Sequence, residues 1–385
     1  MRISIDICQV HSSMLRSSDD VNKSGVDLSG RFSSLYSTLT PRPGLSIGRK
    51  DTTIAGSLTG FVKHRNDIYS VTCRYVAFPA SQSEGYKYKD GEDKLMMSMP
   101  ADNDHKATKA QINDTYSEYY IQLRHSQTKQ AMATDRDYSY QMLQLQHIQE
   151  IYADQLRHVE EYKTDAGYIY AAPKAWYKSS TYKGVLDWVL IRNECTNPKN
   201  QIKPVDFCPA NPIREFIDNF PKNNDWTDKE REALVEKFKA LNGTEPLNIK
   251  HPNSFSEPHN KTVYFKSPSR TSNWRACQMS CIKSVVYKDG HSPSNEHVFV
   301  GRGVQDHVSY KDDSGALIYD IDIIPGPNGA RNTAALLPLA LIWSGDGSGD
   351  IVSGFEDVTF ATPVGAVLKD IESYMGWEEG SLRFC

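Results

Sequence analysis

Short runs of β-branched and aromatic residues, separated by glycines and Asn-Asp turns, occupy two parts of this chain. The first part extends from Leu45 to Phe78 and contains runs such as LSIGRK, AGSLTGFVKH and IYSVTCRYVAF. The second extends from Val263 to Phe360 and contains runs such as TVYFKS, EHVFVGR, GALIYDID and LPLALIWSG. Runs of this length and spacing are typical of a β-meander or barrel. The sequence therefore predicts a mostly β protein.

Helical periodicity interrupts the β pattern between residues 105 and 165. Apolar residues recur there at steps of three and four, with MATDRD as a break between two stretches. They are Ile112, Tyr116, Tyr119 and Leu123, then Leu145, Ile148, Tyr152, Leu156, Val159 and Tyr162. This spacing predicts a hairpin of two long amphipathic helices. The apolar stripe is compatible with an insertion packed on its own body or with a coiled-coil surface for a partner.

Two shorter helices are predicted nearer the carboxyl end. Trp226–Leu241 has a cap at Thr227 and a stop at Asn242-Gly243. Val364–Met375 is a compact amphipathic segment.

Together these patterns divide the chain into four parts. We expect a poorly ordered leader at 1–40 and a first β-barrel at 41–195 that contains the helical insertion. A linker with the helix at about 227–241 follows at 196–255, and a second β-barrel with the terminal helix covers 256–385.

Charge and cysteine usage restrict the partners and the compartment. The formal net charge is -4, and no long Lys/Arg block is present, so we expect neither nucleic acid nor a membrane surface as partner. The amino terminus lacks the apolar core of a secretory signal, and the seven cysteines are an odd number without a paired framework. These features predict an intracellular, cytoplasmic protein.

Other site classes fit the sequence poorly. Cys277 and Cys281 lack a second ligand pair at zinc spacing. The run SGDGSGD at 344–350 lacks the terminal glutamate of a calcium loop, and no GxxxxGK[ST] phosphate loop occurs. We expect no metal and no cofactor.

Three local patterns carry the chemistry, and their order along the chain is informative. They are VTCRYVAF at 71–78, LDWVLI at 186–191 and KDDSGALIYD at 311–320. In this order they resemble the trypsin-like (chymotrypsin-fold) serine peptidases, especially divergent fungal-type and bacterial-type intracellular relatives. The resemblance implies two six-stranded β-barrels with helical insertions. KSPSRTSNW at 266–274 looks like the strand that opens the second barrel, and DVTFATPVGAVL at 357–368 looks like the last strand before the terminal helix.

The resemblance assigns a catalytic role to three residues, one of which has the wrong chemistry. Asp187 matches the aspartate and Ser314 the nucleophile, while Tyr75 stands at the histidine position. A serine attacks a carbonyl only when a base takes its proton, which an imidazole of pKa about 6.5 does well. A phenol with a pKa of about 10 is protonated at neutral pH and offers little basicity. Neither His64 nor His307 stands where the resemblance would place a base against Ser314.

The oxyanion hole and substrate cleft are also assigned by the resemblance. Asp312 replaces the glycine whose N–H, with that of Ser314, would face the developing negative charge. This carboxylate either opposes the charge or points to solvent. LIWSG at 341–345 looks like the strand lining the cleft, which implies roles for Trp343, Ser344 and Gly345. Val308 would form the floor of an apolar specificity pocket.

Three functional hypotheses follow. The chain is a pseudo-protease that binds a peptide or protein, without detectable catalysis or with impaired catalysis. Alternatively, it is an active intracellular serine endopeptidase that uses Ser314. In the third hypothesis, the helices of 105–165 and 226–241 are a scaffold for a protein partner.

Overall fold

The computed structural model covers most of the chain beyond residue 40. It describes residues 41–50, 52–79, 81–132, 137–195, 198–202, 228–241, 246–251, 263–270, 272, 274–288, 290–301, 307–310, 313–324, 333–345 and 358–385. The predicted leader, Asp312, Thr227 and Asn242-Gly243 lie outside these residues.

The first β unit is an open, curved sheet. Its strands follow the order β18-β3-β4-β8-β7-β6-β1-β2, with β5 beside β7. All these neighbours pair antiparallel. The strands are β1 (Ser46–Arg49), β2 (Gly56–Ser57), β3 (Gly60–His64), β4 (Asp67–Thr72), β5 (Tyr86–Lys87), β6 (Met96–Ser98), β7 (Asp165–Ala172), β8 (Val189–Asn193) and β18 (Leu382–Phe384).

The second β unit closes on itself. Strands β14, β12, β11, β15, β16 and β17 form a ring, because β17 pairs with both β16 and β14. Strands β9 and β10, from the region predicted as a linker, extend the sheet beyond β16. The strands are β9 (Gln201–Ile202), β10 (Leu247–Ile249), β11 (Val263–Lys266), β12 (Arg275–Met279), β13 (Ser284–Val286), β14 (Ser294–Gly301), β15 (Leu317–Ile324), β16 (Thr333–Gly345) and β17 (Thr359–Pro363).

The predicted mostly β fold is confirmed as a closed six-stranded barrel beside a half-barrel. This arrangement is similar to the two-barrel chymotrypsin fold. One expectation is corrected for the described residues of KSPSRTSNW. Only Lys266 belongs to a strand, β11, and residues 267–270, 272 and 274 lie outside any strand before β12 starts at Arg275.

One apolar cluster of the described residues spans the two units. It contains Phe61 and Leu190 of the first sheet together with Phe265 and Leu341 of the second, all at most 1 % exposed. Burying each such side chain contributes about 1.5 to 3 kcal/mol. The site described below therefore lies on a continuous, packed interface.

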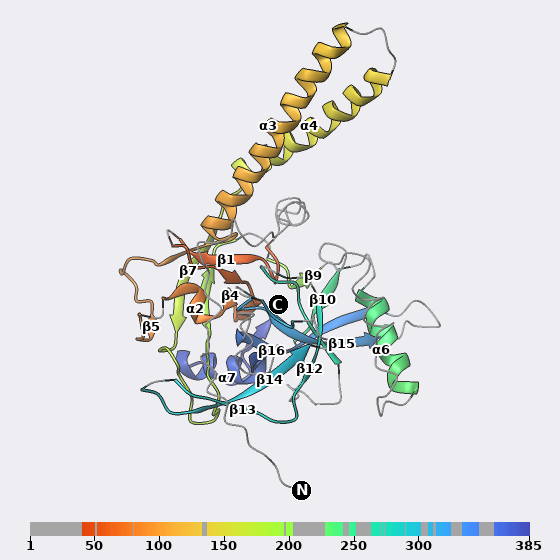
Figure 1. Cartoon of the computed structure of the whole chain (residues 1–385). Coiled ribbons are helices and arrows are strands. Elements are labelled where there is room, and N and C mark those ends of the chain that lie inside the picture. The colour runs from red at the N-terminus through yellow and green to blue at the C-terminus, as the bar shows by residue number, and fades with distance from the viewer. Residues whose placement is uncertain are drawn as a thin grey trace.

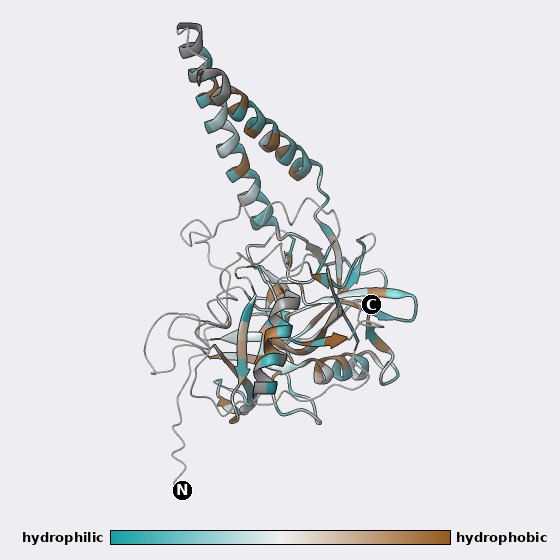
Figure 2. Ribbon diagram, turned by 90° about the vertical axis from the view of Figure 1, so that its right-hand side faces the viewer, coloured by the Kyte–Doolittle hydropathy of each residue, from teal (hydrophilic) through white to brown (hydrophobic). Residues whose placement is uncertain are grey.

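The long helices α3 (Asp102–Met132) and α4 (Asp137–Glu161) form the predicted hairpin, which extends away from the barrels (Figure 1). Ile112 and Val159 are buried between the two helices, and apolar and polar residues alternate along both (Figure 2). At the base of α3, Arg270 forms a two-pronged ion pair with Asp104, each contact 2.6 Å. The partner-binding hypothesis for this hairpin stays a prediction.

Three further helices lie in the described part of the chain. They are the single-turn helix α2 (Arg74–Ala77), α6 (Asp228–Leu241) and α7 (Val364–Met375). The α7 bounds match the predicted segment, and the helix stops at Gly376, whose φ of 70° is left-handed. None of the helices that the structure describes has a stretch apolar and long enough to cross a bilayer.

Candidate functional site

Asp187 is a buried carboxylate at the entrance to β8. It is 3 % exposed, and it accepts a hydrogen bond from the backbone N–H of Tyr75. Its Oδ2 atom has no hydrogen-bond partner among the described residues. Burial raises the pKa of Asp187 to about 7, although the nearby Arg74 guanidinium and the Tyr75 N–H act in the opposite direction. Asp187 is thus a carboxylate lacking part of its usual solvation.

Tyr75 stands in the first turn of α2, directly after β4. The chain is extended at Cys73 and then turns into the helix, so that the Tyr75 N–H reaches Asp187. Arg74 fixes this turn: its buried guanidinium donates to the carbonyls of Pro173, Gln82 and Glu84. The structure therefore brings Tyr75 and Asp187 together.

Ser314 lies in the tight turn that precedes β15. Its Oγ donates to the Trp343 carbonyl at 3.3 Å, and its own carbonyl accepts the Ser57 N–H at 2.8 Å. The next residue, Gly315, has a φ of +96°, and a Cβ there would lie 1.9 Å from the Ser57 carbonyl oxygen. Glycine is required here both by the backbone conformation and by the close approach of the first sheet.

Cys73 connects the Asp187 and Ser314 segments. Its thiol donates to the Ile342 carbonyl at 3.1 Å, and the Gly315 N–H donates to the same carbonyl at 2.9 Å. Burial and the adjacent Asp187 raise the pKa of the Cys73 thiol well above its usual value. Because a thiol carries one proton, Cys73 cannot donate to Ile342 and satisfy Asp187 at the same time.

The Ser314 and Tyr75 segments also meet at Gly56. A Cβ on Gly56 would lie 2.4 Å from the Val76 side chain and 2.8 Å from the Ser314 carbonyl oxygen. Hence α2 and the Ser314 turn both pack closely against β2 at Gly56. The three predicted segments therefore lie close together. Tyr75 contacts Asp187 through its backbone N–H, whereas the Tyr75 and Ser314 segments are connected through Ile342 and Gly56.

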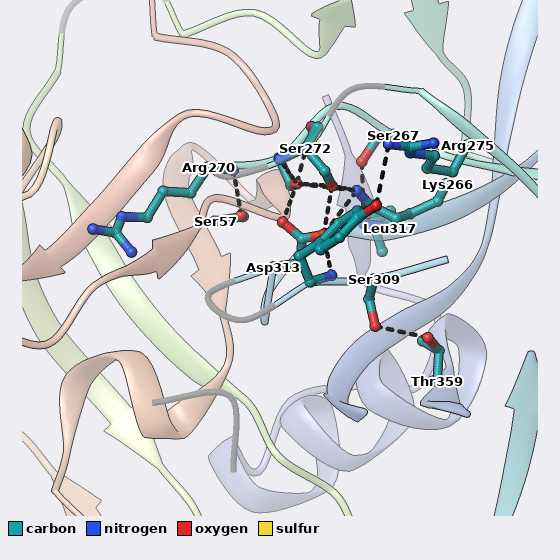
Figure 3. Close-up of polar contacts among 12 residues, drawn as sticks. Ser57, Lys266, Ser267, Arg270, Ser272, Arg275, Ser309, Asp313, Leu317 and Thr359 are labelled. Carbon is teal, nitrogen blue, oxygen red and sulfur yellow. Dashed lines mark hydrogen bonds and ion pairs between the residues drawn. The ribbon is translucent and has the colours of Figure 1, made fainter. Parts of the chain in front are cut away.

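A buried ion pair supports the Ser314 turn (Figure 3). Asp313, the residue before Ser314, accepts hydrogen bonds from Lys266 at 3.0 Å and from the Tyr310 N–H at 2.9 Å. The hydroxyls of Ser269 and Ser272 also donate to the Asp313 carboxylate. Asp313 and Lys266 are fully buried, so the pair needs these extra donors to offset desolvation.

The residues assigned to the cleft are all buried, Val308 in a cluster of the second barrel and Trp343 in the core shared by the two units. Val308 is fully buried in the barrel core, and Trp343 and Ser344 are 2 % and 1 % exposed. Gly345 is buried, and a Cβ on it would lie 2.8 Å from the Ser309 hydroxyl, which contacts Thr359 Oγ1 at 2.7 Å (Figure 3). Asp312, assigned to the oxyanion hole, lies outside the described residues.

The two histidines weighed as replacement bases make other contacts. His64 stacks on Trp377 with ring centroids 3.9 Å apart, and burial lowers its pKa. His307 packs edge-on against Tyr310 at 5.5 Å.

Sequence reasoning missed Cys73, the Lys266–Asp313 pair and Glu296. Glu296 is a fully buried carboxylate that accepts the Val185 N–H at 2.7 Å and the Trp343 indole N–H at 3.3 Å. It thereby joins the Asp187 segment to the Trp343 segment. The advance signal for Lys266 and Glu296 was a charged residue within an apolar run, and Cys73 and Asp313 had no such signal.

Comparison with known proteins adds little to this picture. No protein-family model and no curated protein matches the sequence. A solved glutamic acid specific serine protease, which uses a novel histidine triad in substrate binding, aligns with a TM-score of 0.38 and 10% identity. That alignment covers 89% of this chain and 100% of the other. Thermobifida fusca Protease A aligns with a TM-score of 0.38 and 8% identity, over 89% of this chain and 97% of its own.

Structural similarity at a TM-score of 0.38 and at most 10% identity says nothing about the activity of this chain. The assignment of the fold rests instead on the closed ring of six strands and the half-barrel beside it. This arrangement of strands is similar to the two-barrel chymotrypsin fold.

Proposed function

We propose that this protein is a serine-protease homologue that binds peptide or protein segments and hydrolyses them poorly or not at all. The observation that carries the proposal is the buried Asp187 Oδ2, which has no donor among the described residues, beside the backbone of Tyr75. In a catalytic triad this carboxylate would receive an N–H from an imidazole and orient it. Here the residue whose backbone N–H contacts the carboxylate is Tyr75, which carries a phenol in place of an imidazole.

A second observation that supports the proposal is the fixed position of the Ser314 turn. The Ser314 turn is fixed by Asp313, Gly315 and the Ser57 N–H. Ser314 is 3 % exposed, and its hydroxyl donates to the Trp343 carbonyl. A hydroxyl held by a neutral acceptor has no base to remove its proton, so its nucleophilicity stays low.

The test is hydrolysis of fluorescein-labelled casein by the wild type and by Tyr75→His. A general base contributes about 10² to 10⁴-fold, so we expect the introduced imidazole to raise the rate by at least about 10²-fold. Tyr75→Phe is the matched control, because it keeps the ring and adds no base. The gained activity should disappear in Tyr75→His/Ser314→Ala.

Two results would contradict the proposal. Wild-type cleavage of casein that is abolished by Ser314→Ala would establish an active endopeptidase instead. A folded Tyr75→His variant with no gain would show that Tyr75 is not what limits catalysis.

A further inference from the structure

Two loops beside the candidate site are strongly basic in an otherwise acidic chain. Residues 173–184 lead from β7 toward β8, and residues 280–295 contain β13. Together they hold five lysines and one histidine, with Asp289 as their only acidic residue, whereas the whole chain has a net charge of -4. The lysines are Lys174, Lys178, Lys183, Lys283 and Lys288.

The cations of the two loops gather around Trp176. The Lys288 ammonium lies 5.2 Å from the centroid of the Trp176 indole, and the His291 ring lies 6.0 Å from it. Lys174, Lys178 and Lys288 act electrostatically on His291, lowering its pKa together with burial, which is the largest cause. These groups therefore occupy one neighbourhood.

Lys178 fixes the geometry of this cluster. Its ammonium donates to the carbonyls of Ser292 and Pro293 and to the Ser292 hydroxyl, at 2.5, 2.5 and 2.8 Å. These bonds join the two loops directly. Lys174 and His291 remain exposed to solvent, where they can meet a ligand.

Trp176 has two features that packing alone does not require. Its φ of 57° is left-handed, a conformation that bulky residues rarely adopt. Its side chain is 4 % exposed, and its indole N–H is buried without a hydrogen-bond partner among the described residues. Strained conformations and buried unsatisfied donors in a native structure are concentrated at ligand sites.

The cluster adjoins the candidate site. The Trp176 and Trp343 rings are 5.8 Å apart and nearly perpendicular, and the Trp343 carbonyl accepts the Ser314 hydroxyl. Two described carboxylates act electrostatically with these lysines, Asp187 with Lys288 and Glu296 with Lys178, and both are buried. An incoming anion would thus meet exposed cations first.

Exposed apolar residues flank Lys283 and Lys288 in the sequence. Ile282, Val285 and Tyr287 are 68 %, 45 % and 51 % exposed on and next to β13. A surface that combines exposed apolar groups with excess positive charge is complementary to an acidic peptide that also carries apolar residues.

We propose that Lys174, Lys288 and His291, arranged around Trp176, bind a carboxylate side chain of an acidic peptide that lies beside Ser314. The inference rests on the proposed peptide-binding function and names the class of peptide. The Trp176 N–H is the additional donor, and Lys178 holds the two loops in register.

The test compares two acetylated and amidated heptapeptides, Ala-Glu-Ala-Glu-Ala-Glu-Ala and the same peptide with Gln at each Glu. Binding is measured by calorimetry at low salt. We expect Lys174→Gln/Lys288→Gln to weaken binding of the Glu peptide about five- to tenfold, as two partly exposed charges allow. The control Lys183→Gln/Lys283→Gln removes the same charge from the same loops. It should change the affinity for the Glu peptide by less than about twofold.

A second readout observes the site itself. In protein labelled with ¹⁵N-tryptophan, the indole N–H resonance that Trp176→Phe removes should shift on addition of the Glu peptide and not of the Gln peptide. Equal binding of both peptides, or equal losses in the two lysine pairs, would overturn the inference and leave the proposed function standing. Binding of neither peptide would also overturn it, while casein hydrolysis by Tyr75→His would still decide the proposed function independently.

Discussion

Replacing Asp187 by asparagine should stabilise the protein at alkaline pH. The carboxyl has a pKa of about 7 in the folded chain, against an ordinary value of 3.8. Below pH 3.8 the carboxyl is protonated in both the folded and the unfolded chain, so its ionisation does not affect the free energy of unfolding. As pH rises from 3.8 to 7 the unfolded chain ionises first, so stability falls, and above pH 7 the full cost is present.

The magnitude follows from the two pKa values. At about 1.4 kcal/mol per pKa unit, the cost of the ionised Asp187 is about 4 kcal/mol at pH 8 and about 1.5 kcal/mol at pH 5. Asp187→Asn keeps the shape and an oxygen that can accept the Tyr75 N–H, so it should recover most of each cost. The stabilisation should therefore be about 2.5 kcal/mol larger at pH 8 than at pH 5.

The assay is urea unfolding of both proteins at the two pH values, with equal ionic strength. Asp93→Asn, a change at an exposed position, is the matched control and should alter stability by less than about 0.5 kcal/mol at either pH. An Asp187→Asn effect that is independent of pH, or one that destabilises at pH 8, would refute the reasoning about this carboxylate.

Two predictions concern the Ser314 turn and use the same unfolding assay. Lys266→Met leaves Asp313 buried without its cation and should cost about 3 to 5 kcal/mol, and a loss under about 1 kcal/mol would contradict the role of the pair. Gly315→Ala, with a Cβ 1.9 Å from the Ser57 carbonyl oxygen, should cost more than about 3 kcal/mol, whereas Gly376→Ala at a φ of 70° with open space around it should cost about 1 kcal/mol. Equal losses at the two glycines would show that the contact with Ser57 is unimportant.

The sequence predicts the elements whose signal is local. Periodicity is sufficient for the hairpin of α3 and α4, and the bounds of α7 follow from an apolar stripe that ends at Gly376. The three motifs in order also predict which segments meet, because each is a strand end or turn of a two-barrel fold. In the structure the Tyr75 backbone N–H donates to Asp187. The Cys73 thiol donates to the Ile342 carbonyl, which also accepts the N–H of Gly315, next to Ser314.

Other features depend on contacts between distant residues and have no local signal. The partner of Asp313 is Lys266, 47 positions earlier, and nothing in KSPSRTSNW distinguishes it from Arg270, which pairs with Asp104 instead. Closure of the second barrel likewise depends on β17 pairing with β14 and β16 at once. The cation cluster around Trp176 exists only because Lys178 joins two loops about 114 positions apart.

Labelling of Ser314 by a fluorophosphonate probe tests the absence of a functional base most directly. Wild-type protein, treated at neutral pH and mapped by mass spectrometry, should acquire almost no adduct at Ser314, and Tyr75→His should acquire it at least about 10²-fold faster. Rapid modification of Ser314 in the wild type would contradict the account, because it would show that a base other than residue 75 already activates the hydroxyl.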